Sequence, residues 1–150
     1  MKLWYAWMIP TVAGADLFCK ARVEKMSLSP GEVKPICGGR LLLRRSHNAG
    51  MAFRIGEGRD WTGLSAGLTA LTAAGFLFSL GKRGNGLLRF GLALVTGGGC
   101  SNTFDRYRRT YVVDYLSVPV RWKPLRNLVF NLADLAIAVG TLCTALGIRR

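Results

Sequence analysis

Four long apolar stretches, each almost free of charged side chains, are the feature that most constrains the fold of this chain. They lie at about residues 3–20, 61–80, 87–105 and 128–148. The hydrocarbon core of a bilayer is about 30 Å thick, and roughly 20 helical residues cross it. Each stretch has that length or comes close to it. The pattern therefore predicts a mainly α membrane protein with four transmembrane helices.

The charges of the chain lie mostly outside these stretches. Its 150 residues include 21 Lys and Arg against 8 Asp and Glu, which gives a net charge of +13, and half of the residues are hydrophobic. This length predicts one domain, residues 1–150. The basic residues flank the apolar stretches instead of lining one face with interleaved aromatics, so no nucleic-acid partner is expected. Because juxtamembrane Lys and Arg gain about 1 kcal/mol each beside anionic headgroups, anionic membrane lipids are the expected partner of this charge.

Two of the connections between the apolar stretches predict a small β-containing cap on the periplasmic or extracellular surface. Residues 30–60 are rich in Pro and Gly and contain the apolar run Leu41–Leu43, followed by a segment that reaches Phe53 and Ile55. This pattern is typical of short strands. The β-branched and aromatic segment Tyr111–Tyr115 likewise favours extended backbone over helix.

The remaining connection, Gly81–Gly86, is short and polar, so it predicts an antiparallel hairpin of neighbouring helices. An even number of spans places both termini on one side, together with this hairpin, and both long connections on the other side. Most of the basic residues, however, lie on or beside the long connections. The positive-inside rule taken alone would therefore orient the protein the opposite way.

Four acidic residues lie within or beside the apolar stretches, where an ionised side chain costs at least ~2.5 kcal/mol at mid-bilayer. These are Asp16, Asp105, Asp114 and Asp134. Two of them follow an asparagine at a spacing of three, in Asn102-x-x-Asp105 and Asn131-x-x-Asp134. On a helix this spacing puts the amide and the carboxyl on one face, where the amide is expected to hold its own acid by a hydrogen bond.

The position of Asp114 suggests an acid–base pair. It lies between the third and fourth apolar stretches on a segment predicted to be extended, so the ends of two helices are expected to bring it opposite Asp134. Two facing carboxyls in a water-poor pocket do not both ionise cheaply, so one pKa rises while the other group stays charged. Such a pair provides a general acid and a general base for attack of water on a peptide carbonyl, without metal or cofactor.

Signals for other chemistries are weaker. Four scattered cysteines form no C-x-x-C pair and are interpreted as packing residues. The single histidine, His47, is placed in an Arg-rich loop, and no H-E-x-x-H or G-x-S-x-G motif accompanies it. Gly97–Gly99 lacks the Lys-Ser/Thr of a phosphate loop and is interpreted as a site of close helix packing.

Five short blocks follow one another along the chain. They are Asp16–Lys20, His47–Phe53, Gly98–Arg106, Val112–Tyr115 and Phe130–Asp134. In that order they resemble the patterns D-x-x-x-K, N-x-G-x-A-F, G-G-x-x-N-x-x-D-R, V-V-D-F and F-N-x-A-D of lipoprotein signal peptidase, the type II signal peptidase of bacteria. Five ordered matches across nearly the whole chain make the resemblance to this family specific.

The resemblance implies an intramembrane aspartic endopeptidase that removes the signal peptide from diacylglyceryl-modified prolipoproteins before the lipidated cysteine. The family's catalytic dyad corresponds here to Asp114 and Asp134. Asn48 and Arg106 are implied to contact the substrate backbone, and Asp105 is implied to be a neighbouring structural acid that pairs with Arg106. Supporting roles are implied for Asn102, Asn131, Asp16 and Lys20.

The resemblance also implies a multi-pass protein of the bacterial cell membrane, a monomer whose partner is a lipid-modified prolipoprotein. The N-terminal stretch imitates a cleavable signal around Ala13–Ala15, yet the family pattern implies that it stays as the first span. Two alternatives follow from the residues alone. One is a non-catalytic membrane adaptor or lipid-binding protein whose acids only stabilise helix packing. The other is a proton-coupled transport subunit, which the lack of an inverted repeat disfavours.

Overall fold

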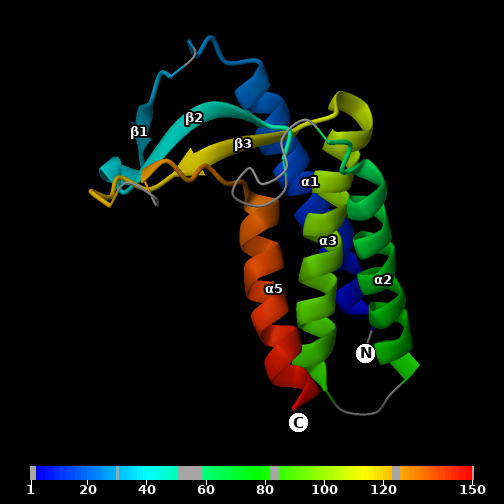
Figure 1. The fold of residues 1–150 in the computed structure, drawn as a ribbon. Helices are drawn as coiled ribbons and strands as arrows, with labels where there is room; N and C mark the ends of the chain where they lie inside the picture. Colours follow the sequence, from blue (N-terminus) through cyan, green and yellow to red (C-terminus); the bar gives the residue numbers. More distant parts are fainter. Residues whose placement is uncertain (1–2, 30, 51–58, 82–84, 123–125, 150) are drawn as a thin grey trace.

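The protein is a bundle of helices with a small sheet at one end (Figure 1). The computed structural model describes residues 3–29, 31–50, 59–81, 85–122 and 126–149. Within these residues the elements are, in chain order, α1 (Trp4–Glu24), β1 (Lys34–Ile36), the 3₁₀ turn η1 (Cys37–Gly39), β2 (Leu41–Asn48), α2 (Thr62–Gly81), α3 (Gly86–Arg109), β3 (Val112–Ser117) and α5 (Leu132–Ile148). The predicted mainly α class with a small sheet is confirmed.

The helices coincide with the four apolar stretches but differ at their ends. α1 continues to Glu24 and α3 to Arg109, beyond the stretches predicted from apolarity. Polar side chains on these extra turns contact the end of β2: Glu24 lies 2.7 Å from His47, and Arg106 donates to the carbonyl oxygen of Gly50. The end of the apolar stretch therefore does not end the helix. α5 begins only at Leu132, since Phe130 forms a β-bridge with Leu116 and Asn131 caps the helix in extended backbone.

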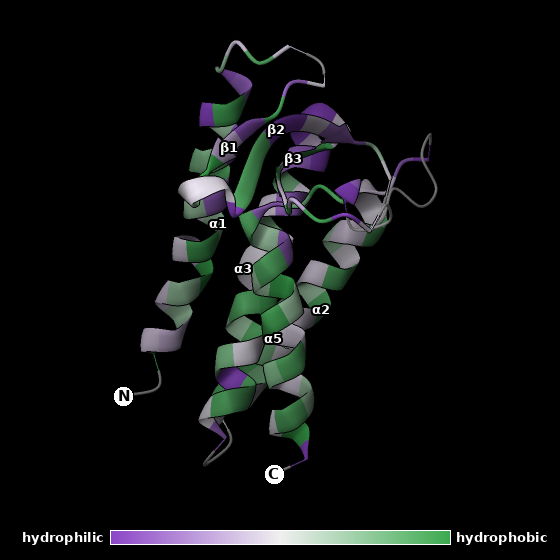
Figure 2. Cartoon of the chain, turned by 90° about the vertical axis from the view of Figure 1, so that its left-hand side faces the viewer, coloured by the Kyte–Doolittle hydropathy of each residue, from purple (hydrophilic) through white to green (hydrophobic). Residues whose placement is uncertain are grey.

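The sheet and the helices differ in hydropathy. Figure 2 shows the hydrophilic residues gathered at the sheet and the hydrophobic ones along the helices. Among the described residues, α2 is the helix whose length and composition suit it to cross a membrane, and α5 is an apolar helix of 17 residues. α1 and α3 are longer, with 21 and 24 residues, but carry charged side chains. The number of spans stays a prediction.

The sheet joins the two long connections. Its order is β1-β2-β3 with antiparallel pairs, and a bulge in β2 between Leu43 and Ser46 shifts the register against β3. The strands predicted in the cap are therefore present, whereas Phe53 and Ile55 lie outside the described residues. The sheet occupies the end of the bundle opposite to the start of α1 and the end of α5 (Figure 1), as the topology predicted. Residues 82–84 of the predicted hairpin also lie outside the described part.

α3 is the central helix, and its glycines allow the other helices to approach it. The three glycines of Gly97–Gly99 face three different partners. A methyl group added to Gly97 would lie 3.0 Å from the carbonyl oxygen of Ile9 in α1. One added to Gly98 would lie 2.6 Å from the carbonyl oxygen of Ala133 in α5, and one added to Gly99 would lie 2.7 Å from Oγ1 of Thr69 in α2. The prediction that these glycines serve close packing is confirmed.

Gly98→Ala is expected to destabilise the fold by about 1–3 kcal/mol, because the added methyl group meets the backbone of α5, which cannot rotate away as a side chain can. Thermal unfolding of the purified protein in detergent measures this change. Gly67→Ala in α2 is the matched control, since nothing lies within 4 Å of its added methyl group. The control is expected to be neutral or stabilising, because alanine is the better helix former. Equal unfolding temperatures for both variants would contradict the packing role of Gly98.

Candidate active site

The two aspartates predicted to act together lie where β3 meets the start of α5. Asp114 is in the middle of β3, and its residue is 3% exposed. Asp134 is in the first turn of α5 and is partly buried. Its place is set by a reciprocal cap, in which the Asp134 N–H donates to Oδ1 of Asn131 at 2.8 Å and the Asn131 N–H donates to Oδ2 of Asp134 at 3.1 Å. The cap fixes the carboxyl at the helix N-terminus, where negative charge is favoured.

The two asparagine side chains hold acids other than those predicted. Nδ2 of Asn131 donates to Oδ1 of Asp114 at 2.8 Å, and Nδ2 of Asn102 donates to Oδ1 of Asp134 at 3.0 Å. The expectation that each amide group would hold the acid three residues later was wrong. Asn131 lies outside the helix as its cap, so its carbonyl group faces the backbone of Asp134 and its amino group is directed to β3. Asn102 faces α5, whereas Asp105 faces α1.

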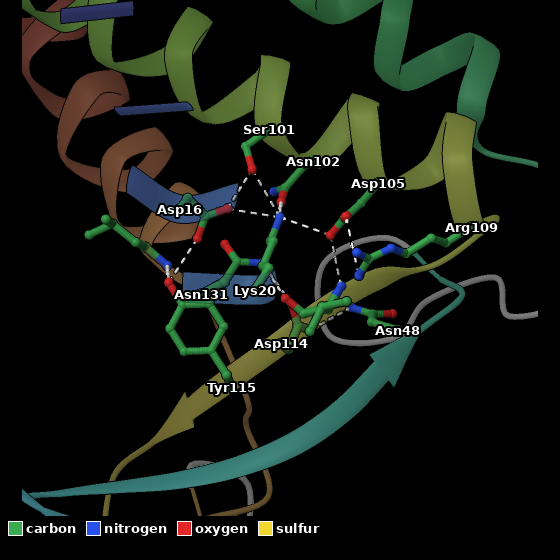
Figure 3. A network of polar contacts seen from close by, with 12 residues as sticks. Asp16, Lys20, Asn48, Ser101, Asn102, Asp105, Arg109, Asp114, Tyr115 and Asn131 are labelled. Atoms are coloured by element: carbon green, nitrogen blue, oxygen red, sulfur yellow. Dashed lines mark hydrogen bonds and ion pairs between the residues drawn. The ribbon is translucent and has the colours of Figure 1, made fainter. Parts of the chain in front are cut away.

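The amides also connect the two acids to each other. Nδ2 of Asn131 lies 3.3 Å from Oδ1 of Asn102, so hydrogen bonds run from Asp114 through both asparagines to Asp134. The second oxygen of Asp114 accepts from Nδ2 of Asn48 at 3.2 Å. Both carboxyls are therefore held in one network that draws on β2, β3, α3 and α5. Figure 3 shows the part of it around Asp114, Asn131 and Asn102.

The surroundings of Asp114 favour its protonated form. Burial raises the pKa of this carboxyl, and the negative charge of Asp134 raises it further. Hydrogen bonds from Asn48 and Asn131 and the charge of Lys20 lower it, and the balance places the pKa at about 7. An acid that would ionise near pH 4 in water therefore keeps a proton into the neutral range.

A buried ion cluster lies directly behind this pair. Nζ of Lys20 is 2.8 Å from Asp16 and 3.1 Å from Asp105, and all three side chains are at most 1% exposed. Lys20 also donates to Oγ of Ser101 at 3.1 Å and to Oδ1 of Asn102 at 2.9 Å. The predicted support by Asp16 and Lys20 thus has a physical basis. By occupying the carbonyl oxygen of Asn102, Lys20 leaves the amino group of that side chain to face Asp134.

Asp105 does not pair with Arg106 as expected. Besides Lys20, it accepts from the N–H of Val113 at 3.1 Å and lies 3.8 Å from Arg109. Arg106 instead donates to the carbonyl oxygen of Gly50 at 2.8 Å. Successive helical residues point about 100° apart, so neighbours in sequence cannot face each other. The pair expected from sequence adjacency is replaced by an i,i+4 contact.

Asn48 and Arg106 lie beside the acids on the side of the cap. Oδ1 of Asn48 accepts from the N–H of Gly50, while Arg106 holds the carbonyl group of the same glycine. Together they fix the end of β2 next to Asp114. Their predicted contact with substrate stays a prediction.

His47 is in β2 and not in a loop as predicted. It lies 2.7 Å from Glu24 and stacks on Tyr111 with ring centroids 4.3 Å apart. This contact ties the end of α1 to the sheet. All four cysteines are free. The part of the chain that the structure describes contains no group of three His, Cys, Asp or Glu side chains suited to a metal ion.

Two residues of the network were not singled out from the sequence as site residues. Oγ of Ser101 donates to Oδ2 of Asp16 at 2.6 Å, and the hydroxyl group of Tyr115 donates to Oδ1 of the same acid at 2.9 Å. The signal was present in both cases. Ser101 adjoins Asn102, and Tyr115 adds a hydroxyl group where the pattern V-V-D-F has phenylalanine.

Comparison with known proteins decides the family. Residues 8–149 match the family model described as Signal peptidase (SPase) II. The chain belongs to the signal peptidase II family. Signal peptidase II enzymes are membrane proteases, so this protein is a hydrolase of the membrane, and a non-catalytic adaptor is the weaker account.

Individual relatives agree with the signal peptidase II assignment. The chain is 36% identical over 120 residues to a lipoprotein signal peptidase of Moorella thermoacetica, and the aligned region covers 79% of this chain and 75% of the relative. It is 35% identical over 129 residues to that of Caldicellulosiruptor bescii, covering 85% and 78%. Two solved structures of bacterial membrane enzymes share the fold at 18% sequence identity, and each match covers 96% of this chain. The first has a TM-score of 0.79 and is covered over 86% of its length, and the second has a TM-score of 0.76 and is covered over 91%.

Proposed function

We propose that this protein removes the signal peptide from diacylglyceryl-modified prolipoproteins before the lipidated cysteine, with Asp114 and Asp134 as its catalytic dyad. The family and the names of the relatives support the substrate class. The assignment of the dyad is supported by the hydrogen bonds of two asparagines that contact each other: Asn131 donates to Asp114, and Asn102 donates to Asp134. A metal or a covalent nucleophile is not required by this chemistry.

The two acids divide the work by their environments. Asp114 is the more deeply buried and holds a proton near neutral pH, so it acts as the general acid toward the carbonyl oxygen of the scissile peptide. Asp134, at the helix N-terminus and more accessible, acts as the general base that removes a proton from the attacking water. Asp134 then returns that proton to the leaving amine as the C–N bond breaks. Asp114 regains its proton from a hydroxyl group of the tetrahedral intermediate as the new carboxyl group forms, so both acids recover their starting states.

The same proposal places four helices across the membrane. The charges inside α1 and α3 need not oppose insertion, because Lys20 pairs with Asp16 and Asp105 within the bundle and Arg109 lies 3.8 Å from Asp105. Exposed aromatic side chains lie toward both ends of the bundle, with Trp4 and Trp7 at the start of α1 and Tyr107 near the end of α3. Tryptophan and tyrosine gather at the two membrane interfaces in this way.

The cap would then lie on the outer surface of the bacterial cell membrane. Its exposed basic residues, Lys34 and Arg40 among them, face the headgroup region, where anionic lipids would offset the charge that the positive-inside rule leaves unexplained.

Cleavage of a lipid-modified peptide tests this function. The purified protein in detergent or vesicles is given a prolipoprotein peptide with a diacylglyceryl cysteine, and in parallel the same peptide with a free cysteine. Mass spectrometry is expected to show cleavage before the cysteine of the modified peptide alone. Cleavage elsewhere, or equal cleavage of both peptides, would contradict the proposed substrate class.

A further inference from the structure

The hydroxyl group of Tyr115 joins three elements behind the dyad. It donates to Oδ1 of Asp16 in α1 at 2.9 Å and accepts the backbone N–H of Leu132 at 3.1 Å (Figure 3). Tyr115 itself is in β3 and is 4% exposed. The hydroxyl group is therefore a buried bridge from α1 through β3 to α5.

The bridge ends on the backbone that carries Asp134. Leu132 is the first residue of α5, and the N–H groups of a first helical turn have no acceptor within the helix. The cap of Asn131 satisfies the N–H of Asp134, and Tyr115 satisfies that of Leu132. Asp114 precedes Tyr115 in β3 and its side chain points to the opposite face of the strand. Beside the Asn131 side chain, which bonds Asp114 and caps Asp134, the Tyr115 side chain thus helps to fix the start of α5 relative to the strand that carries the other acid.

The backbone around Tyr115 reinforces this connection. The N–H groups of Tyr115 and Leu116 both donate to the carbonyl oxygen of Phe130, at 3.1 and 2.8 Å, and the N–H of Phe130 donates back to Leu116 at 2.8 Å. These bonds hold residue 130 but not the helix that begins at Leu132. The side-chain hydroxyl group extends the connection to the N–H of Leu132, as a second contact beside that of the Asn131 side chain.

The hydroxyl group also has a fixed role as donor. Burial and the negative charge of Asp16 raise the pKa of Tyr115, so it stays protonated throughout the working range. Its proton is directed to Asp16, which leaves an oxygen lone pair for Leu132. Asp16 in turn is held by Lys20 at 2.8 Å and Ser101 at 2.6 Å. The bridge therefore rests on a rigid support.

We propose that Tyr115 is a positioning residue, whose hydroxyl group sets the separation of Asp114 and Asp134 by anchoring the start of α5. The inference rests on the proposed function. Tyr115 and Asp114 point to opposite faces of β3, so the hydroxyl group acts through the start of α5 and not on the reacting atoms.

Three variants test this role: Tyr115→Phe, Leu132→Pro, and the two combined. Tyr115→Phe removes one oxygen atom and keeps the ring, so the fold is retained while the N–H of Leu132 loses its acceptor. Leu132→Pro removes that N–H, and proline is well tolerated at the first position of a helix. Asn131, at φ −127° and ψ 177°, already has the extended backbone that a following proline requires.

Tyr115→Phe is expected to lower kcat on the lipid-modified peptide about tenfold with KM unchanged, because a small displacement of a catalytic group costs rate and not binding. Leu132→Pro removes the other partner of the same hydrogen bond, so it is expected to lower kcat by a similar factor, and the double variant is expected to lower it no further than either single variant. Thermal unfolding of each variant separates loss of folded protein from loss of rate.

The outcomes divide cleanly. A lowered kcat in both single variants, with no further loss in the double variant, supports the proposal. An unchanged kcat in Tyr115→Phe, a loss that follows the unfolding temperature, or losses that multiply in the double variant would each overturn it. Wild-type protein that does not cleave the peptide at all would instead refute the proposed function.

Discussion

Replacement of Asp114 or Asp134 by asparagine is expected to lower turnover of the lipid-modified peptide by about a thousandfold or more. Asparagine keeps the size and most hydrogen bonds of each side chain but neither donates an acidic proton nor accepts one. General acid and general base catalysis each contribute about 10²–10⁴ in rate, so loss of either partner disables the shared step. Initial rates of the purified variants in detergent measure the effect.

Asp60→Asn provides the matched control for these variants. Asp60 lies just before α2 and is exposed, and its carboxyl accepts the N–H of Thr62 at 2.8 Å, which lowers its pKa. An asparagine oxygen can keep that bond, so turnover should be close to wild type. A variant of Asp114 or Asp134 that turned over as fast as the control would remove that residue from the mechanism.

Lys20→Met is expected to destabilise the protein by about 3–5 kcal/mol, the usual cost of leaving a buried charge without its partner. The ammonium group is the shared counter-ion of Asp16 and Asp105, both fully buried. Its loss leaves two carboxylates facing each other and frees the carbonyl oxygen of Asn102. Chemical denaturation followed by circular dichroism measures the stability of the fold.

Two further variants keep this prediction testable. Lys25→Met removes an exposed lysine just beyond the end of α1 and should change stability little. Asp105→Asn combined with Lys20→Met leaves one buried carboxylate instead of two, and should restore part of the lost stability. A Lys20→Met protein as stable as the Lys25→Met control would show that the cluster contributes little to the fold.

Much of the fold follows from the sequence because its signals are local. Apolar length predicts the helices, and β-branched and aromatic residues predict the strand around Asp114. The close approach of Gly97–Gly99 follows from three small residues in an apolar helix. Each of these patterns acts within a few residues, so its consequence is visible without knowledge of the rest of the chain.

The hydrogen-bond partners within the site could not be predicted in the same way. Spacing of three suggested that Asn102 holds Asp105, yet the helix faces Asn102 toward α5 and Asp105 toward Lys20. The ends of the helices were also predicted wrongly. A charged side chain such as Lys20 is tolerated within a helix when it is buried against a distant partner, whereas apolarity alone places the end of the helix there. These choices depend on contacts between residues some 80 positions apart, such as Lys20 and Asn102.

A titration of the Asp114 carboxyl by isotope-edited carbon NMR, in wild-type protein and in Asp134→Asn, tests the dyad most directly. The account predicts a midpoint near pH 7 in the wild type, where the pKa is about 7, and turnover that declines as pH rises through it, since the general acid loses its proton. In Asp134→Asn the midpoint should move to lower pH, because the neighbouring negative charge is gone. The same midpoint in both proteins, or a wild-type midpoint near that of a free aspartate, would contradict the account.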